Sequence, residues 1–512
     1  MKQFFDRYFW MALCLIFVFY FSSVFVYGRE TASLVFLMFF ALITTLLTVR
    51  KLHTGVAIAF VELFCNSHGA MIAAPIFGFE LTLRMVIFIG VMLGWLIGLL
   101  FRRIAFQHFT SRNILLPFCI LFFATIVGLL NGVASRDFGV VFSDGNAYLF
   151  FLYLLPILSI DWDQKRKHKM LQILAAGAVW VLLMSIVLLY VFSHMSEPTL
   201  RVIYTFLRDA RVAEITILFS GVYRVFIQSQ VFTIVFALVL FCAVSTGLFA
   251  KRWILMEGFF ASVVILSLSR SFWFGVIPAL VFAVVFILAK GNLSRYNLIK
   301  LLPIHIFACL FAFLIVAATL FFPFPARNLD SGLLADSFKD RTSETQDAAI
   351  SSRWNLLGPM LDAILERPII GSGFGKTVTF KTLDPRAVAE NPEGNWTTYS
   401  MEWGWLELWL KMGILGPIAF LFLGFCVVVG LMRGWCDDNG WVSVGLASGV
   451  IFIFATHVFS PYLNHPIGIG FLLFCVPFFK LKKSCVCVLD AFEPLKLKGN
   501  QKELAVVSTQ IK

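Results

Sequence analysis

Apolar runs of about 20 residues recur along the whole chain, separated by short polar segments. A run of this length can cross the hydrocarbon core of a bilayer as a helix. The pattern therefore predicts an all-α, polytopic helical membrane protein with about 12–14 transmembrane helices. The run at 54–78 is interrupted by CNSHG at 65–69, which predicts a broken or re-entrant span. The predicted spans lie near residues 8–27, 32–49, 54–78, 82–101, 113–131, 146–160, 170–193, 230–249, 254–268, 272–289, 301–323, 405–431, 441–459 and 467–479.

Composition and charge refine this class. The 512 residues are 60% hydrophobic, which is more apolar surface than a soluble chain normally carries. Because basic loops stay in the cytoplasm, the charge pattern predicts that both termini are cytoplasmic. The net charge of +12 then reflects orientation in the membrane rather than nucleic-acid binding. The first apolar run is too long for a cleavable signal peptide. Lys and Arg gather in segments that alternate with the spans, at 50–51, 102–103, 163–169, 251–252, 290–300 and 480–483.

This orientation leaves two long segments on the outer face, residues 194–229 and 324–404. Arginine outnumbers lysine on that face, whereas lysine is the commoner of the two on the cytoplasmic side. Arginine grips phosphate through a planar, bidentate fork, so its excess favours recognition of a phosphate or pyrophosphate group at the outer surface. The alternative is a set of solvated arginines paired with acidic residues. Neither outer segment contains cysteine, so no disulfide framework is expected.

The second outer segment contains ERPIIGSGFGKT at 366–377, which looks like a phosphate-binding loop. The nucleotide-binding pattern needs a glycine five residues before Gly375, but that position is Ile370. The segment is also predicted to lie outside the cell, where ATP is absent. We therefore expect Gly371, Gly373 and Gly375 to shape a tight outer loop, next to a phosphate-bearing lipid or packed against a helix.

Three arginines are candidate phosphate ligands. Arg224 stands at the entry to an apolar span, and Arg270 lies between two spans with only serines as polar neighbours. An arginine in that position must find a partner in the protein or in a ligand. Ser351 and Ser352 are predicted to cap an outer helix, which would place Arg353 in its first turn, near the positive end of the helix dipole.

Two residues are candidate proton acceptors. Glu402 stands at the predicted membrane edge, where a partly dehydrated carboxylate can act as a base; the alternative is a simple interfacial anchor. His465 follows the penultimate span on the outer side, where a histidine is a base or an incidental loop residue. Glu407 and Lys411 are spaced i, i+4 on one helix and are predicted to pair.

Together these residues resemble the O-antigen ligase and polymerase superfamily of bacterial inner membranes. The resemblance runs from about 224 to 432 and rests on an arginine at a span entry, a Ser-Arg pair before a span, an outer SRW…PxxGxGxG loop, and Leu406, Gly413 and Gly416 opening the next span. It divides the chain into N-terminal transmembrane helices (1–223), a ligase-like core (224–432) that includes a periplasmic loop (324–404), C-terminal helices (433–479) and a cytoplasmic tail (480–512).

The resemblance implies a GT-C-like fold and a glycosyltransferase that needs no metal or nucleotide cofactor. Such an enzyme moves a glycan from undecaprenyl pyrophosphate to an acceptor hydroxyl at the periplasmic face, as a polymerase on another glycan or as a ligase on lipid A–core. Arg224, Arg270 and Arg353 would bind the donor. Family members often carry a His-Asn pair eleven residues before the first glycine of the last motif, where this chain has Glu402, so Glu402 and His465 both remain candidate bases.

The competing hypothesis is a transporter, for example a flippase for lipid-linked oligosaccharides. Transporters usually show internal repeats and polar groups at mid-membrane. This chain shows no internal repeat, and Glu62 and Glu257 are the exceptions among its otherwise apolar spans.

Overall fold

The computed structural model describes residues 3–76, 78–104, 112–217, 223–247, 250–289, 295–325, 348–382, 388–389, 391–435 and 440–479. The predicted cytoplasmic tail at 480–512 lies outside the described residues, as do parts of the basic segment at 290–300 and of the outer segment at 324–404.

The first half of the chain is a series of apolar helices. They are α1 (Arg7–Val26), α2 (Glu30–Arg50), α3 (Leu52–Cys65), α4 (Leu83–Leu100), α5 (Arg112–Val133), α6 (Phe138–Gly145), the 3₁₀ helix η1 (Asn146–Tyr153), α7 (Leu154–Leu158), α8 (Gln164–His194) and the amphipathic α9 (Glu197–Asp209).

The second half continues the bundle. Its helices are α10 (Gln230–Ser245), α11 (Lys251–Leu266), α12 (Arg270–Ala289), α13 (Arg295–Leu320), α15 (Ala348–Glu366), α17 (Gly404–Met412), α18 (Leu415–Met432), α19 (Gly440–Thr456), η2 (Tyr462–Asn464), α20 (Pro466–Cys475) and η3 (Val476–Phe478).

The described strands form three two-stranded antiparallel hairpins. These are β1 (Ala73–Ile76) with β2 (Phe79–Thr82), β3 (Glu214–Ile217) with β4 (Tyr223–Phe226), and β5 (Val378–Lys381) with β6 (Asn395–Thr398). Each pair lies in a segment that joins two helices, so the hairpins extend loops rather than build a sheet core.

The predicted class, an all-α polytopic membrane protein, is confirmed. Within the described part of the chain, nine helices are long and apolar enough to cross a bilayer, and four shorter apolar helices accompany them. The centre of the bundle is formed by helices that are buried on nearly every side, above all α10, α19 and α20. Outer helices such as α12 expose large apolar side chains, as expected where a helix faces lipid.

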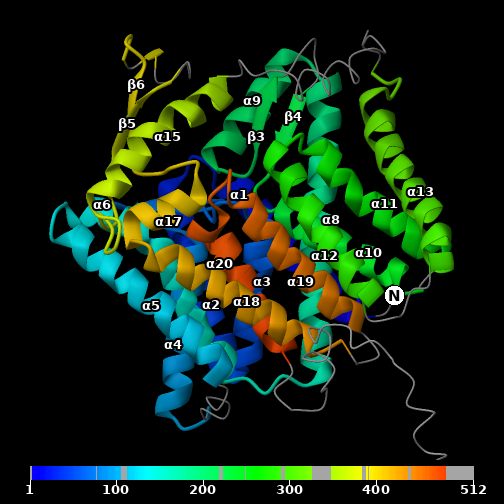
Figure 1. The fold of residues 1–512 in the computed structure, drawn as a ribbon, viewed down its shortest axis with the longest axis horizontal. Coiled ribbons are helices and arrows are strands. Elements are labelled where there is room, and N and C mark those ends of the chain that lie inside the picture. Colours follow the sequence, from blue (N-terminus) through cyan, green and yellow to red (C-terminus); the bar gives the residue numbers. More distant parts are fainter. Residues whose placement is uncertain are drawn as a thin grey trace, which may run out of the picture.

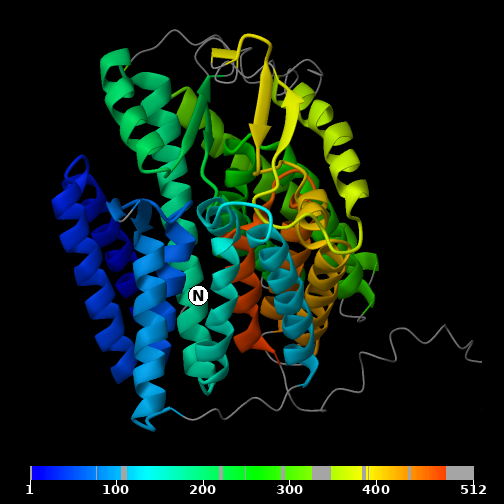
Figure 2. The ribbon, with the colours of Figure 1, turned by 90° about the vertical axis from the view of Figure 1, so that its left-hand side faces the viewer.

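The two segments predicted to share one face do lie at the same end of the bundle. Figures 1 and 2 both place α9, the β3–β4 hairpin, α15 and the β5–β6 hairpin at the same end of the bundle. Which compartment this end faces stays a prediction from the basic loops.

Two local predictions have different outcomes. The interruption predicted at 65–69 is confirmed, because α3 ends at Cys65 and a loop follows it. The predicted caps at Ser351 and Ser352 are wrong, because both residues lie inside α15. The helix includes Ala348 and Ala349, the residue type with the highest helix propensity, so it reaches back past the two serines. Arg353 is therefore not in the first turn.

Candidate active site

A short turn between α11 and α12 positions Arg270. The Ser269 and Ser271 hydroxyls are 3.0 Å apart, and Leu268 adopts a left-handed backbone with φ of 43°. A branched residue in this region costs about 1 kcal/mol, and such strain is often found at functional sites. Helix α12 begins at Arg270, so the arginine stands at the positive end of the helix dipole. A fixed cation and a helix start in one place favour an anionic ligand.

Arg224 reaches the same turn from a different element. It lies on β4, opposite Thr216 of β3. Its Nε donates a hydrogen bond to the Ser267 carbonyl at 3.1 Å, and its guanidinium carbon lies 4.8 Å from the centre of the Phe226 ring. These two contacts orient the guanidinium without neutralising its charge. The β3–β4 hairpin therefore places Arg224 next to the turn that contains Arg270.

The segment between α19 and α20 closes over this turn. The Ser460 hydroxyl donates to the Ser271 hydroxyl at 3.1 Å, and the Tyr462 ring lies 6.1 Å from the Phe272 ring. Burial raises the pKa of the Tyr462 phenol, Glu214 adds to this effect, and the charge of Arg224 opposes it. Residues 457–465 thus form one wall of the region around Arg224 and Arg270.

His465 belongs to this wall. It precedes α20, is half-buried, and lies in the segment fixed by the hydrogen bond from the Leu463 amide to Nδ1 of His457, at 3.1 Å. Burial lowers the pKa of His465 to about 4, and the charges of Lys411 and Arg84 act in the same direction. The imidazole is therefore uncharged at neutral pH, the form that can accept a proton.

Glu402 and Arg353 approach the same wall from the outside. The two side chains form an ion pair, and the neighbouring Trp403 donates from Nε1 to the Arg353 carbonyl at 2.9 Å. The Trp403 ring lies 5.4 Å from Phe459, next to Ser460. Half of the Glu402 side chain is exposed, and its carboxylate forms an ion pair with Arg353, so its role as a base stays a prediction. The alternative base, His465, has the drier position.

The glycine-rich loop at 366–377 uses its backbone groups inside the protein. Ser372 N donates to the Leu410 carbonyl at 2.7 Å, and Gly373 N to the Lys411 carbonyl at 3.1 Å. The next two amides donate to the Gly128 carbonyl at 3.0 Å and to a carboxylate oxygen of Asp144 at 2.7 Å. A loop whose amides are already bonded in this way does not cradle a phosphate. Its closeness to α5 and α17 supports the packing interpretation.

Two of the glycines are needed for this packing. Gly371, Gly373 and Gly375 have φ of 73°, 83° and 78°, the left-handed region that favours glycine. A Cβ on Gly371 would collide with the Gly413 nitrogen, and one on Gly373 with the Gly132 nitrogen. Gly371 of the loop motif and Gly413 of the following motif therefore pack against each other. This contact gives a structural reason for the presence of glycine in both motifs.

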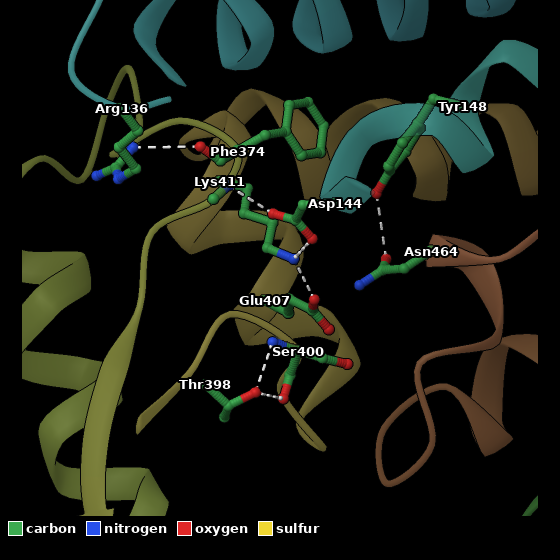
Figure 3. A network of polar contacts seen from close by, with 10 residues as sticks. Arg136, Asp144, Tyr148, Phe374, Thr398, Ser400, Glu407, Lys411 and Asn464 are labelled. Atoms are coloured by element: carbon green, nitrogen blue, oxygen red, sulfur yellow. Dashed lines mark hydrogen bonds and ion pairs between the residues drawn. The ribbon is translucent and has the colours of Figure 1, made fainter. Parts of the chain in front are cut away.

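Beside this loop lies a buried cluster of one lysine and two carboxylates (Figure 3). Lys411 pairs with Glu407, as predicted from their spacing, and also with Asp144 of α6; all three side chains are at most 5% exposed. The two carboxylates lie on either side of the Lys411 ammonium group, so the buried charges compensate one another. Asp144 also accepts from Gly375 N at 2.7 Å, so the cluster ties the loop to the bundle.

Sequence reasoning missed Asp144 and the wall at 457–465. The available signal for Asp144 was a carboxylate directly before the apolar run at 146–160.

The two charged residues noted in apolar spans are paired: Glu62 with Arg84 at 3.0 Å, and Glu257 with His305 at 2.7 Å. Across the described residues, no group of three or more His, Cys, Asp or Glu side chains is arranged to hold a metal ion.

Comparison with known proteins gives one match. Residues 255–421, 167 of the 512 in the chain, match a family model described as O-antigen ligase. The matched range begins in α11 and ends in α18, so it contains Arg270, Arg353 and Glu402 but neither Arg224 nor His465. No curated protein and no solved structure matches the chain.

Proposed function

We propose that this chain, which carries a domain of the O-antigen ligase and polymerase superfamily at residues 255–421, transfers a glycan from a lipid pyrophosphate to an acceptor hydroxyl. The family match indicates a membrane glycosyltransferase of ligase or polymerase type. The proposal adds the donor, undecaprenyl pyrophosphate, and the location, the periplasmic face of a bacterial inner membrane. It also adds that the chemistry needs neither a metal nor a nucleotide.

The observation that carries the proposal is the hydrogen bond that fixes Arg224 to the turn directly before Arg270. Arg224 donates to the carbonyl of Ser267, three residues before Arg270, although the two arginines come from different elements. Two guanidinium groups at the end of a transmembrane bundle suit a pyrophosphate whose lipid tail lies in the bilayer. They would stabilise the negative charge that grows on the pyrophosphate as it leaves.

The acceptor side is assigned to His465. The acceptor oxygen attacks the anomeric carbon, the bond from that carbon to the phosphate oxygen breaks, and the lipid pyrophosphate departs with the bonding electrons. The proton of the acceptor hydroxyl passes to the imidazole of His465, which is uncharged at neutral pH. Glu402 is the second candidate, but its ion pair with Arg353 occupies the carboxylate.

Arg353 is assigned to the edge of the site. Its partner Glu402 holds it beside the wall at 457–465, through Trp403 and Phe459. In this position Arg353 would contact the donor by exchanging the Glu402 carboxylate for a phosphate oxygen.

Glycan analysis in the bacterium that makes this protein tests the proposal. Arg270→Ala is compared with wild type at equal protein level, with Arg201→Ala, an exposed arginine of α9 at the same end of the bundle, as the matched control. Surface polysaccharide is resolved on a gel, and lipid-linked intermediates are extracted in parallel.

The expected result is a loss of long surface chains in Arg270→Ala and not in Arg201→Ala. Accumulation of single repeat units identifies a polymerase, whereas long chains that stay on the carrier and never reach lipid A identify a ligase. If deletion of the gene removes the polysaccharide while Arg270→Ala leaves it unchanged, the pyrophosphate site is wrong and the transporter hypothesis takes its place.

A further inference from the structure

Helix α15 exposes a stripe of apolar residues along one of its sides. In a helix of 3.6 residues per turn, Trp354, Gly358, Leu361 and Leu365 point within about 60° of one another. All four are exposed, Trp354 by 61% and Leu365 by 71% of the side-chain surface. These four residues are called the apolar stripe of α15. An exposed apolar row that is continuous over several turns marks an interaction surface.

The other sides of α15 have a different character. Met360 belongs to a small buried core that the helix shares with β5 and α17. Asn355, Asp362 and Glu366 form an exposed polar row, about 90° around the helix from the apolar stripe. A helix that is apolar on one exposed side and polar on the next is typical of the boundary between lipid and water. Helix α15 is not among the nine described helices that are long and apolar enough to cross a bilayer.

The apolar stripe continues into the exposed side of α18, which is a candidate membrane span. The Ile414 amide, directly before α18, donates to the Pro368 carbonyl at 3.0 Å, and Trp409 Nε1 donates to the same oxygen at 2.8 Å. Ile369 and Ile370 directly follow Pro368, and both are exposed, as is Ile414. This junction therefore joins two exposed apolar surfaces. The exposed residues of the second surface repeat the spacing of the stripe: Ile414, Ile418, Leu421 and Phe425.

The order of residues along α15 fits a helix that enters a lipid leaflet at an angle. Figures 1 and 2 both show α15 as an oblique helix, with its C-terminal end close to α17 and its N-terminal end farther from the bundle. Trp354 therefore lies farther out than Leu365, and its ring is 5.7 Å from that of Trp403. Tryptophan is enriched at the headgroup level of a bilayer, whereas leucine and isoleucine favour the hydrocarbon.

We propose that the apolar stripe of α15 lies in the lipid leaflet at this end of the bundle. Trp354 would lie among the headgroups and Leu365 among the first carbons of the acyl chains, while the polar row faces water. The outer segment at 324–404 is then partly a membrane-surface helix and not a loop in water. The contact follows from the surface of α15 alone and does not depend on glycan transfer. If the proposed function also holds, the contact keeps Arg353, next to Trp354, at the level of a lipid-linked pyrophosphate.

Photo-cross-linking of the full-length protein in its native membrane tests the contact. The photoreactive residue p-benzoyl-phenylalanine replaces one side chain at a time, Leu361 or Leu365 in the stripe. Glu366 is the matched control, because it is exposed, adjacent to Leu365 and about 100° around the helix. Leu421, on the exposed side of α18, is the lipid-facing reference. After irradiation, mass spectrometry measures lipid adducts per full-length chain, and gel electrophoresis detects adducts to other proteins.

The expected result is that the two stripe positions give lipid adducts at a level close to that of Leu421. This level should exceed the level at Glu366 by at least about fivefold, because an interfacial helix buries its apolar side in lipid and leaves its polar side out. Equal lipid adducts at Leu365 and Glu366 would overturn the inference. So would cross-linking of Leu361 and Leu365 to another protein in place of lipid, since a protein would then cover the stripe.

Discussion

Two cationic clusters at the same end of the bundle use positive charge differently. Lys411 is buried and lies between two carboxylates, from its own helix and from α6. Arg224 is oriented by a carbonyl and an aromatic ring, at a turn that also carries Arg270 and a strained Leu268. In the first cluster, the carboxylates neutralise the charge of Lys411, and the ion pairs join α17 to α6. In the second cluster, the carbonyl and the ring orient Arg224, and neither of these two groups carries a charge that would neutralise it.

This difference bears on which region could bind a phosphate, the glycine-rich loop beside Lys411 or the turn that carries Arg270. The glycine-rich loop has the composition of a phosphate loop, but its amides bond to α5 and α17 and to Asp144. The less conspicuous Ser-Arg turn combines Arg270 at a helix start with Arg224 on the neighbouring hairpin, and we propose that the phosphate binds there. Substitutions in the Lys411 cluster should therefore affect folding, and those at the arginine turn should affect transfer.

The largest effect is expected from Lys411→Met. It leaves Asp144 and Glu407 buried without their cation, which should lower the free energy of unfolding by about 3–5 kcal/mol. Thermal unfolding in detergent measures the loss. The triple variant Lys411→Met, Asp144→Asn, Glu407→Gln is the control and should recover most of it. An unchanged melting temperature in Lys411→Met would show that the cluster does not join the loop to the bundle.

Arg224→Ala should reverse this pattern. The variant should melt close to wild type, while transfer falls about 10²–10³-fold, as on removal of one preorganised donor to a developing anion. Arg224→Lys keeps the charge but loses the planar fork, so it should recover transfer only in part. The measurement is incorporation of glycan per unit of folded protein. Full activity in Arg224→Ala would remove this arginine from the site.

Gly373→Ala tests the packing role of the glycine-rich loop. The position has φ of 83°, and the added methyl group would meet the Gly132 backbone, so destabilisation of about 1–3 kcal/mol is expected. Gly358→Ala is the matched control, because it lies in α15 with nothing within 4 Å of the added Cβ, and it should gain up to about 1 kcal/mol. Equal melting temperatures for both variants would contradict the packing role.

Glu402→Gln separates the two candidate bases. It removes a partly exposed ion pair, so its cost in stability should be at most about 1 kcal/mol. Transfer should persist in Glu402→Gln and be lost in His465→Gln, measured with the same assay of glycan incorporation. The opposite outcome would return the role of base to Glu402.

The smallest effect concerns pH. The folded pKa of His465 is about 4, below its ordinary value of 6.5, so between these values the unfolded chain binds a proton that the folded protein does not. This group therefore contributes stability above pH 6.5 that is lost progressively as pH falls to about 4. The variant His465→Asn should show a shallower decline of melting temperature with acidification in that window. An identical slope would place His465 in a more open environment.

The sequence predicted what depends on local pattern. Apolar runs predicted the helical class, and i, i+4 spacing predicted the Glu407–Lys411 pair. The capping of α15 was wrong because alanines upstream of the serines extend the helix. The Asp144–Lys411 contact joins residues 267 positions apart, and the Ser271–Ser460 contact joins residues 189 apart. Helical periodicity carries no information about contacts at such separations, so the wall at 457–465 needed the structure.

The turn at residues 267–270, together with Arg224, is proposed to bind a pyrophosphate. Native mass spectrometry of the purified protein with farnesyl pyrophosphate tests it directly in wild type, Arg270→Ala and Arg201→Ala. Loss of a charged hydrogen-bond partner costs about 1.5–3 kcal/mol, so Arg270→Ala should bind more weakly by about 10-fold or more, and Arg201→Ala should bind like wild type. Equal binding by all three proteins would contradict the account.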